Sequence, residues 1–240
     1  MKKLFFTFLS LAFLSANAQT ADEIIQKYAA NLGGLDAFNN IKTAKMTGTY
    51  TVQGMDLPLV IQIVNGKAAR TDVKIEAMNM EIIGVYNNGK GWKQNPAAGV
   101  NIPTEVTAAA ELNELKMQSM IAPVLIDYKA RGHKVELLGQ SDVEGIKTYK
   151  IKLTFKEDNK VTTYYISNSD YTLIKSESER EMQGQTVNVE SFYSDLKEFN
   201  GVKFFMTRTQ KLNGEVFQTT TLSTVELDIP IDEKIFEMPK

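Results

Sequence analysis

The side chains that most often carry catalysis are scarce in this chain of 240 residues. It has no cysteine, and His133 is its single histidine. These counts exclude thiol catalysis, histidine-rich zinc sites and the common histidine-based triads. His133 stands between Gly132 and Lys134, where a predicted helix passes into a predicted strand. A histidine in that place is most often a loop or capping residue, so we expect no metal and no other cofactor.

Carboxylates are more numerous, but their spacing selects no pair for acid–base catalysis. Asp142, Glu144, Glu157, Asp158 and Asp170 all fall at predicted turns, where such side chains are ordinary turn formers. The sequence also lacks the G-x-S-x-G nucleophile turn and the glycine-rich motifs that bind phosphates or dinucleotides. We therefore predict that the protein is not an enzyme.

Methionine usage indicates binding of apolar groups instead. The chain has ten methionines, and this flexible, polarizable side chain suits surfaces that accept varied apolar partners. Ordinary core filling is the better explanation for any single methionine, so the prediction depends on several of them gathering on strand faces and on one helical insert. The predicted lipid-binding residues are Met46, Tyr50, Leu59, Ile61, Ile63, Val73, Ile75, Met117, Met120, Ile121 and Val124.

The insert itself is the longest helix-like pattern in a chain that otherwise alternates like strands, and it covers residues 104–129. Thr104 can cap its first helix. Pro123 forbids one continuous helix, so we predict two short helices, the second ending at Gly132. An amphipathic insert must bury its apolar face, and the concave side of the sheet is the available place. We therefore predict a helical lid over residues 104–131.

Strand signals dominate the rest of the chain. From Ile41 onwards, apolar and polar residues alternate with a period of two, and turn signals such as Asn65-Gly66 separate the runs. A helix precedes them, with a capping box at Thr20 and Glu23. We count about eleven strands, and a twisted sheet of that size curls. The predicted fold is mainly β (α+β): a strongly curved antiparallel sheet or incomplete β-barrel, with an N-terminal helix and a helical lid insert.

Two arginines differ in their predicted direction. Arg208 shares strand parity with Phe204 and Met206, which places it toward the inside of the curve or its rim. Arg70 shares parity with Asp72, which places it toward solvent. An inward arginine can bind the backbone carbonyls of a lid or a carbonyl of a ligand. Snorkelling at a strand end is the simpler interpretation for both.

The chain begins with the order of a secretory signal peptide: Lys2 and Lys3, an apolar run, and the small residues Ala16 and Ala18 around a cleavage site. The run is shorter than the ~20 residues of a membrane span. We expect a single soluble periplasmic domain over residues 19–240, which cannot carry a lipid on an N-terminal cysteine. With a net charge of −2 and scattered lysines, we predict no binding to nucleic acid or to anionic membrane surfaces. We expect a monomer.

The chain resembles one known family in the segments that flank its insert. These segments are GGLDAFNNIKTAKMTGTY, TYYISNSDYTLIKSES, SFYSDLKEFNGVKFF and DIPIDEKIFEMP. Together they look like the periplasmic outer-membrane lipoprotein carrier superfamily, the LolA-like half-barrels, over almost the whole mature chain. The resemblance implies an antiparallel half-barrel wrapped around helices, with a cavity that takes acyl chains. It assigns the lid-tethering arginine of that family to neither Arg70 nor Arg208.

These expectations combine into a function. We predict a periplasmic carrier that binds the acyl chains of lipoproteins or other lipids in an apolar cavity, for transfer toward the outer membrane. Its expected partners are an acylated lipoprotein or lipid and the lipid-transfer proteins of the inner and outer membranes. The alternative is a periplasmic sensor or interaction module in which the insert plugs a ligand-free half-barrel. A cavity under the insert favours the carrier, and a filled interior favours the plug.

Overall fold

The computed structural model describes residues 19–239 except residue 183, so the predicted signal peptide lies outside the described residues. Thirteen antiparallel strands form one sheet in the order β6-β5-β4-β3-β2-β1-β13-β12-β11-β10-β9-β8-β7. The strands are β1 (Thr43–Val52), β2 (Met55–Val64), β3 (Ala68–Ile75), β4 (Met80–Asn87), β5 (Lys90–Asn95), β6 (Val100–Glu105), β7 (Lys134–Val143), β8 (Ile146–Thr154), β9 (Val161–Ser167), β10 (Leu173–Met182), β11 (Gln185–Phe199), β12 (Val202–Leu212) and β13 (Glu215–Leu227). The helices are α1 (Ala21–Asn31), α2 (Leu35–Asn40), α3 (Ala109–Gln118) and α4 (Tyr128–Arg131), with short 3-10 turns η1 (Glu76–Met78), η2 (Pro96–Ala98) and η3 (Glu233–Phe236).

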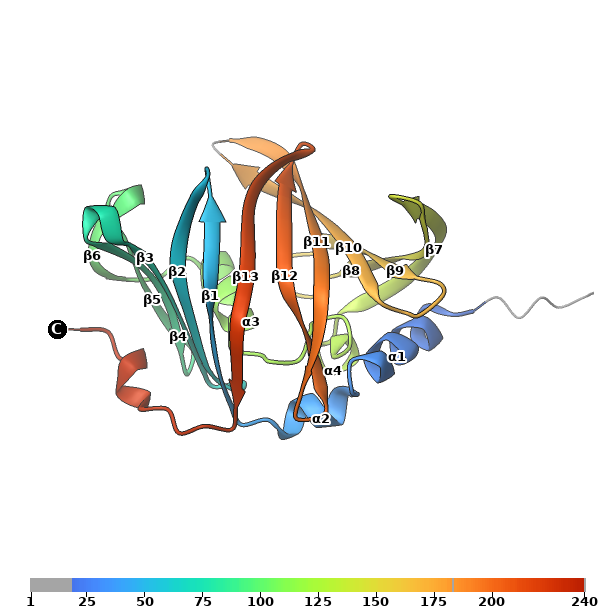
Figure 1. Cartoon of the computed structure of the whole chain (residues 1–240), viewed down its shortest axis with the longest axis horizontal. Coiled ribbons are helices and arrows are strands. Elements are labelled where there is room, and N and C mark those ends of the chain that lie inside the picture. The colour runs from blue at the N-terminus through green and yellow to red at the C-terminus, as the bar shows by residue number, and fades with distance from the viewer. Residues whose placement is uncertain (1–18, 183, 240) are drawn as a thin grey trace, which may run out of the picture.

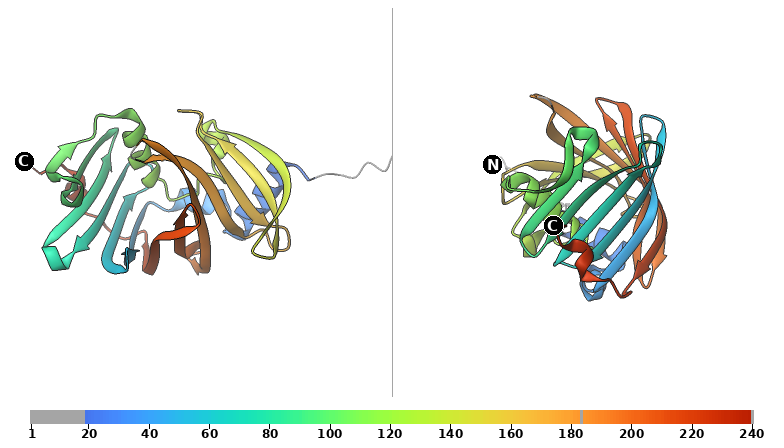
Figure 2. Two further views of the ribbon diagram at one scale, coloured as in Figure 1. Left: turned by 90° about the horizontal axis from the view of Figure 1, so that it is seen from above. Right: turned by 90° about the vertical axis from the view of Figure 1, so that its left-hand side faces the viewer.

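The sheet is open and strongly curved, as predicted. β1 pairs with β13 at its centre, which joins an N-terminal arm, β6 to β1, to a C-terminal arm, β13 to β7. The arms diverge from this centre; α3 lies against the N-terminal arm, and α1 lies against the C-terminal arm (Figures 1 and 2). A bulge between Thr47 and Gly48 interrupts the β1–β13 register, and bulges increase local twist. Only glycine fits at position 48, because a Cβ there would lie 2.1 Å from the carbonyl oxygen of Thr221.

The sheet has more strands than the eleven predicted. The sequence pattern predicts a loop over residues 96–103, whereas the structure places residues 96–98 in η2 and residues 100–103 in β6. Pro103 argues against a central strand because proline cannot donate a ladder hydrogen bond. β6 tolerates it because this strand is an edge of the sheet and pairs only with β5.

The helix α1 begins with the predicted capping box. The Thr20 hydroxyl accepts from the Glu23 backbone N–H at 3.2 Å, and the Glu23 carboxylate accepts from the Thr20 backbone N–H at 3.0 Å. α1 and α2 then pack on the concave face of the sheet, where they form the main core. We call this core the floor. Its buried residues are Ile24, Ile25, Tyr28, Leu32, Phe38, Ile41, Ala44, Met46, Ile63, Ala69, Ile121, Ala122, Leu125, Ile126, Tyr128, Ile151, Leu153, Tyr164, Ile166, Leu173, Val202, Met206 and Val225.

The insert forms two short helices, α3 and α4, separated by a non-helical stretch that contains Pro123, as predicted. Its start differs from the prediction, because Thr104 belongs to β6 and pairs with Lys93 of β5. α3 begins only after Ala108, whose side chain provides no cap. The predicted lid over residues 104–131 therefore starts too early. Strand pairing with β5 satisfies the Thr104 backbone, which the local capping signal could not reveal.

A smaller core lies on the convex face, beneath the C-terminal segment. Trp92 Nε1 donates to the carbonyl oxygen of Phe236 at 3.1 Å, and Arg70 Nη1 donates to that of Ile235 at 2.8 Å. Arg70 also pairs with Asp72 at 2.7 Å. The prediction that Arg70 points to solvent is wrong, because the tail, distant in sequence, covers it. Phe236 is 1% exposed and anchors this tail on the sheet.

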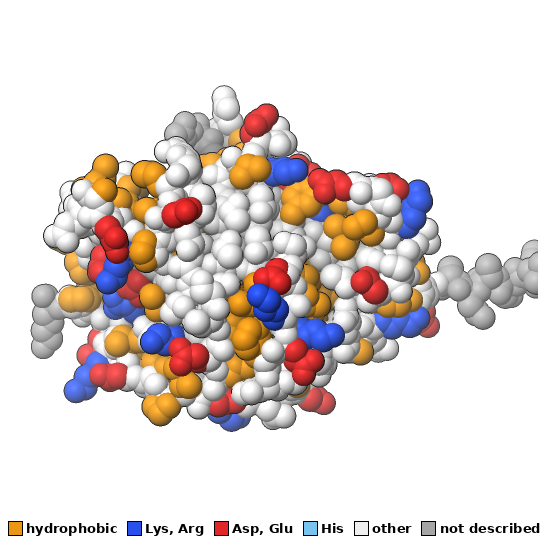
Figure 3. Space-filling model, in the orientation of Figure 1, with side chains coloured by type: hydrophobic (Ala, Val, Ile, Leu, Met, Phe, Trp, Pro, Cys, Tyr) orange, Lys and Arg blue, Asp and Glu red, His pale blue; other side chains and the backbone are white. Residues whose placement is uncertain are grey.

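The convex face otherwise mixes side chains of both charge signs with small apolar patches (Figure 3). Lys175, for example, pairs with Glu177 at 2.5 Å and with Glu190 at 2.9 Å. Positive charges on this face lie beside carboxylates. Over the part of the chain that the structure describes, this view shows no basic patch of the kind that binds nucleic acid.

Candidate functional site

An apolar patch lies on the concave face, on β1 to β4 and β13. Cross-strand register places its members on one side of the sheet: Leu59 pairs with Val73, and Leu57 pairs with Tyr50. No residue of the described helices contributes to it. We call this patch the apolar wall. It consists of the buried residues Leu57, Leu59, Val73 and Ile75, with Tyr50, Val52, Ile61, Met80, Ile82 and Leu222 packed against them.

A series of polar side chains continues the concave face from the wall onto β13, β12 and β11. The Tyr50 hydroxyl donates to Gln218, whose amide donates to Gln210. Gln210 Nε2 donates to Ser191 Oγ at 3.2 Å, and Arg208 Nη2 donates to the same oxygen at 3.1 Å. We call Gln218, Gln210, Ser191 and Arg208 the polar strip. Ser191 and Gln210 are buried, whereas Arg208 is exposed.

Tyrosine hydroxyls lie close to the polar strip. The hydroxyl of Tyr193 hydrogen bonds with that of Ser176 at 3.0 Å, and the guanidinium carbon of Arg208 lies 6.0 Å from the centre of the Tyr193 ring. Burial raises the pKa of Tyr164, and the positive charge of Arg208 opposes that rise. Burial also raises the pKa of Tyr28. Tyr28 and Tyr164 therefore stay uncharged at neutral pH, so this region holds no negative charge from them.

The helix α3 lies across β3, β4 and β5 of the N-terminal arm. Leu115 occupies the space above two glycines: a Cβ added at Gly91 would lie 2.9 Å from its side chain, and one at Gly84 would lie 3.4 Å from it. Lys93 of β5 pairs with Glu111 of α3 at 2.5 Å. No residue of α3 is buried. Few contacts hold this helix, so we infer that it opens more easily than the strands beneath it.

The other end of the insert is attached to α1 and to the C-terminal arm. Lys129 pairs with Asp22 of α1 at 2.6 Å. Arg131 Nη2 donates to the carbonyl oxygen of Ala122 at 2.9 Å. The arginine that binds the insert backbone thus belongs to the insert itself and is neither of the two weighed from the sequence. With α3 on one arm and α4 by the other, the insert spans the hollow between the arms (Figure 2).

Nine of the eleven predicted lipid-binding residues lie in or against the wall or the floor, and the other two, Met117 and Met120, belong to neither. Ile61 packs against both, and Met117 is exposed on α3, whereas Met120 is half-buried beside Gly66. The structure therefore does not gather the whole predicted set into one cluster. In the wall lie Tyr50, Leu59, Val73 and Ile75, and in or against the floor lie Met46, Ile63, Ile121 and Val124.

The polar strip is the part of this surface that sequence reasoning largely missed. Strand parity correctly indicated an inward Arg208, and Gln210 has the same parity. Gln218 could not be found this way, because the register shift at Thr47 and Gly48 changes the parity of β13, so that Gln218 lies on the same face as Val225 although their numbers differ by seven. Ser191 lies on β11, and no local signal distinguishes it from the other serines of the chain.

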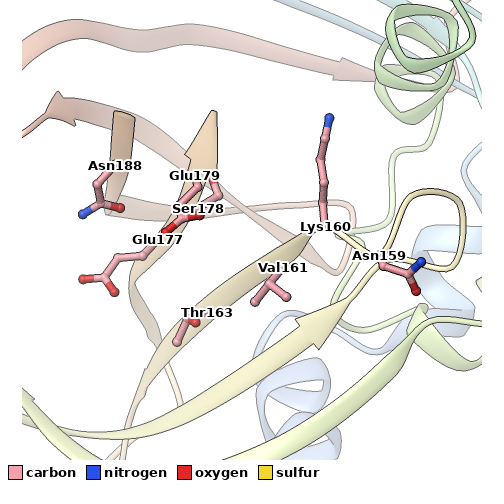
Figure 4. Close-up of a pocket in the computed structure, with 8 residues that line it drawn as sticks. All are labelled: Asn159, Lys160, Val161, Thr163, Glu177, Ser178, Glu179 and Asn188. Atoms are coloured by element: carbon pink, nitrogen blue, oxygen red, sulfur yellow. The ribbon is translucent and has the colours of Figure 1, made fainter. Parts of the chain in front are cut away.

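A pocket of about 410 Å³ lies elsewhere, at one end of β9, β10 and β11 (Figure 4). Its side chains are mostly polar: Asn159, Lys160, Val161, Thr163, Glu177, Ser178, Glu179 and Asn188. Thr163 pairs with Glu177, while the neighbouring pair, Tyr164 and Ser176, faces the floor. Because strand side chains alternate, Thr163 and Glu177 face the convex side. This pocket is therefore separate from the apolar wall, and we assign it no lipid.

His133 is a buried structural residue. Its Nδ1 accepts a hydrogen bond from the Lys156 backbone N–H at 3.2 Å, and its ring lies 5.0 Å from that of Phe155. Burial lowers the pKa of His133, although the carboxylate of Glu157, 3.7 Å away, favours its protonated form. Among the described residues, no group of three or more histidine, cysteine, aspartate or glutamate side chains is placed to hold a metal ion.

This burial predicts a pH dependence of stability. A histidine whose pKa is lower in the folded than in the unfolded state stabilises the fold above its unfolded pKa of about 6.5, and that stability is lost as pH falls through the folded pKa. We expect the Tm to fall between pH 7.5 and pH 5. In His133→Phe, which keeps a ring against Phe155, this fall should be smaller. An equal fall in both proteins, measured by circular dichroism, would assign the effect to other groups.

Comparison with known proteins identifies the fold. A LolA superfamily protein from Nitrosomonas europaea superposes with a TM-score of 0.60 at 15% identity, covering 92% of this chain and 98% of that one. A DUF1329 family protein from Desulfovibrio piger gives 0.61 at 10% identity, with coverage of 92% and 98%. An outer membrane lipoprotein-sorting protein domain from Vibrio parahaemolyticus gives 0.59 at 9% identity, with coverage of 90% and 97%.

These similarities confirm the LolA-like fold that the sequence resemblance implies, and at these identities they concern the fold alone. No protein-family model matches the sequence, and no curated protein sequence does. Within the described residues, no helix is both long enough and apolar enough to cross a membrane.

Proposed function

We propose that this chain, which has a LolA-like half-barrel fold, is a periplasmic carrier that binds the acyl chains of lipoproteins or other lipids and moves them toward the outer membrane. The observation that carries the proposal is the apolar wall: Leu57, Leu59, Val73 and Ile75 lie on the concave face, and no residue of the described helices belongs to their cluster. A contiguous apolar surface in a concave setting is typical of a lipid-binding site. The predicted signal peptide supports the periplasmic location.

The energetics suit reversible carriage. Each buried methylene contributes ~0.8 kcal/mol, so a sixteen-carbon chain gains about 12 kcal/mol on leaving water. The same chain gains a similar amount in a membrane, so a carrier must not bind it much more tightly than that. In this proposal α3 lowers the affinity, because it has no buried residue and contacts β3 and β4, two strands of the wall. A ligand that must displace part of the insert binds with lower affinity, because the lost contacts oppose binding.

In this proposal the acyl chain first contacts the wall and then the residues under the insert. The wall supplies Leu59, Val73 and Ile75, and Ile61 leads from the wall to the floor. Met117 lies on α3 and Met120 lies just after it. Both side chains would adjust to the shape of the bound chain, since methionine adapts to varied apolar shapes. Delivery to an outer-membrane acceptor, and loading from an inner-membrane donor, belong to the same proposal.

A second candidate is a sensor or interaction module without a ligand. It is favoured by the middle of the insert, where Ile121, Ala122, Leu125 and Ile126 are already buried in the floor. This stretch packs into the core on the concave face of the sheet, as a plug would. The two candidates differ in one observable property: the carrier takes up a lipid and the plugged module does not.

The test is lipid binding by the purified mature chain. Titration with cis-parinaric acid, whose fluorescence rises in apolar surroundings, should show saturable uptake, and a diacyl lipopeptide should compete for the site. Native mass spectrometry of protein isolated from a bacterial periplasm should show co-purified lipid. Absence of both uptake and co-purified lipid would reject the carrier and leave the plugged module.

A further inference from the structure

The apolar wall and the polar strip are neighbours on one continuous surface. Tyr50 connects them: it packs against the wall, and its hydroxyl donates to Gln218 of the strip. The strand pairing places Tyr50 and Arg208 in one row across the sheet: Tyr50 pairs with Thr220 of β13, and Thr220 pairs with Arg208 of β12. Adjacent strands lie about 4.8 Å apart, so the Arg208 backbone lies roughly 10 Å from that of Tyr50 along the sheet. One lipid molecule can reach both.

Arg208 differs in its partners from Arg70, which lies under the tail, and from Arg131, which lies in the insert. Arg70 pairs with Asp72 at 2.7 Å and Arg131 pairs with Asp127 at 3.0 Å. Arg208 forms no ion pair with any carboxylate in the described part of the chain. Its Nε and Nη2 reach only a serine oxygen, and its Nη1 donates to no described residue.

The serine beneath it adds a second donor. Ser191 Oγ accepts from Arg208 Nη2 at 3.1 Å and from Gln210 Nε2 at 3.2 Å, which occupies both of its lone pairs. Its own hydroxyl hydrogen has no acceptor among the described side chains. Ser191 is only 3% exposed, so Gln210 and the strand hold it in place. The site therefore presents hydrogen-bond donors and a positive charge.

The neighbouring side chains leave the positive charge of Arg208 without a compensating negative charge. Next to Arg208 on the concave face lie uncharged side chains, those of Tyr193, Thr220 and Gln210. The carboxylate of Glu190, adjacent in sequence to Ser191, is on the opposite face of β11, where Lys175 neutralises it at 2.9 Å. An anionic oxygen placed at Arg208 thus meets no nearby negative side chain, and guanidinium binds such oxygens with short, strong hydrogen bonds.

We propose that Arg208 and Ser191 form a head-group site for an anionic lipid, whose carboxylate or phosphate accepts from them while its tail lies along the apolar wall. This inference rests on the proposed carrier function and makes it more specific. It names the ligand class as a single-headed anionic amphiphile, such as a fatty acid or an alkyl phosphate. An acyl chain whose head is a neutral ester or amide would use the wall without the charge of Arg208.

The test compares ligands that share a tail and differ in the head. cis-Parinaric acid and its methyl ester are titrated against the full mature chain, and dodecyl phosphate competes in a separate experiment. We expect the acid to bind about tenfold more tightly than the ester, which corresponds to about 1.4 kcal/mol. Arg208→Gln should remove this difference by weakening the acid alone, and Arg208→Lys should restore part of it. Displacement of the acid by dodecyl phosphate would extend the site to phosphate heads.

The matched control is Arg180→Gln, which removes the same charge from an exposed residue of β10, on the same face but paired with Val187 of β11. It should leave the ratio of acid to ester affinity unchanged. Equal binding of acid and ester by the wild type, or an equal loss for both ligands in Arg208→Gln, would overturn the head-group site while the carrier function stands. If the wild type binds neither ligand, the carrier function itself fails.

Discussion

Replacing Ile61 with aspartate is expected to weaken fatty-acid binding on the order of 100-fold, which corresponds to about 2.7 kcal/mol. Ile61 lies on the concave face of β2 and packs against both the apolar wall and the floor. A carboxylate there remains hydrated in the empty protein, and an acyl chain that covers it must remove that water without supplying a partner. Burial of an unpaired charge costs several kcal/mol or forces its protonation. The measurement is titration with cis-parinaric acid at pH 7.5.

The control is the adjacent residue. Gln62 lies on the opposite face of the same strand, where it pairs with Arg70 of β3, so Gln62→Asp adds the same charge outside the hollow. It should bind the fatty acid as the wild type does. Circular dichroism must show that both variants are folded at the assay temperature. Unchanged affinity in a folded Ile61→Asp protein would mean that the acyl chain does not pass the wall.

Truncation of Phe38 is expected to cost about 3–5 kcal/mol of folding free energy, the usual range for an aromatic residue removed from a core. Phe38 is fully buried in α2, and its ring meets that of Phe204 edge to face at 5.7 Å. Its carbonyl oxygen also accepts from Asn65 Nδ2 at 3.2 Å, which connects α2 to the β2–β3 turn. For a chain of this size, such a loss lowers the Tm by roughly 6–20 °C.

Differential scanning calorimetry of Phe38→Ala and of Asp36→Ala gives the comparison. Asp36 is exposed on the same short helix, so its truncation changes α2 without creating a cavity in the floor. We expect its Tm to stay within about 2 °C of the wild type, as for most surface substitutions. A similarly small change in Phe38→Ala would show that α2 contributes little to the core.

Local signals in the sequence were sufficient for most of the elements. Thr20 and Glu23 predicted the start of α1, Pro123 predicted the break in the insert, and alternation predicted a curved antiparallel sheet. These signals work because capping, proline geometry and strand alternation depend on residues within a few positions of one another. The predicted helix start at Thr104 was wrong: this residue has the type of a helix cap, yet its pairing with β5 makes it part of a strand.

The candidate site was less predictable because its parts come from distant strands. The pairing of β1 with β13 joins the two ends of the chain, and only that pairing sets Tyr50 beside Gln218 and in line with Arg208. Bulges at Gly48 and after Gln210 then change which side chains share a face. The alternation of side chains within a single strand does not reveal these register shifts, because they arise from pairing with another strand.

By itself, the sequence determined a curled, mostly antiparallel β chain with a helical insert and little catalytic chemistry, because composition and short-range patterns encode those properties. The tertiary structure alone decided that insert residues fill the floor, that Arg70 lies under the tail, and that a donor-rich strip adjoins the apolar wall. The physical reason is that each depends on which distant backbones hydrogen bond and in which register, a choice made by packing of the whole chain.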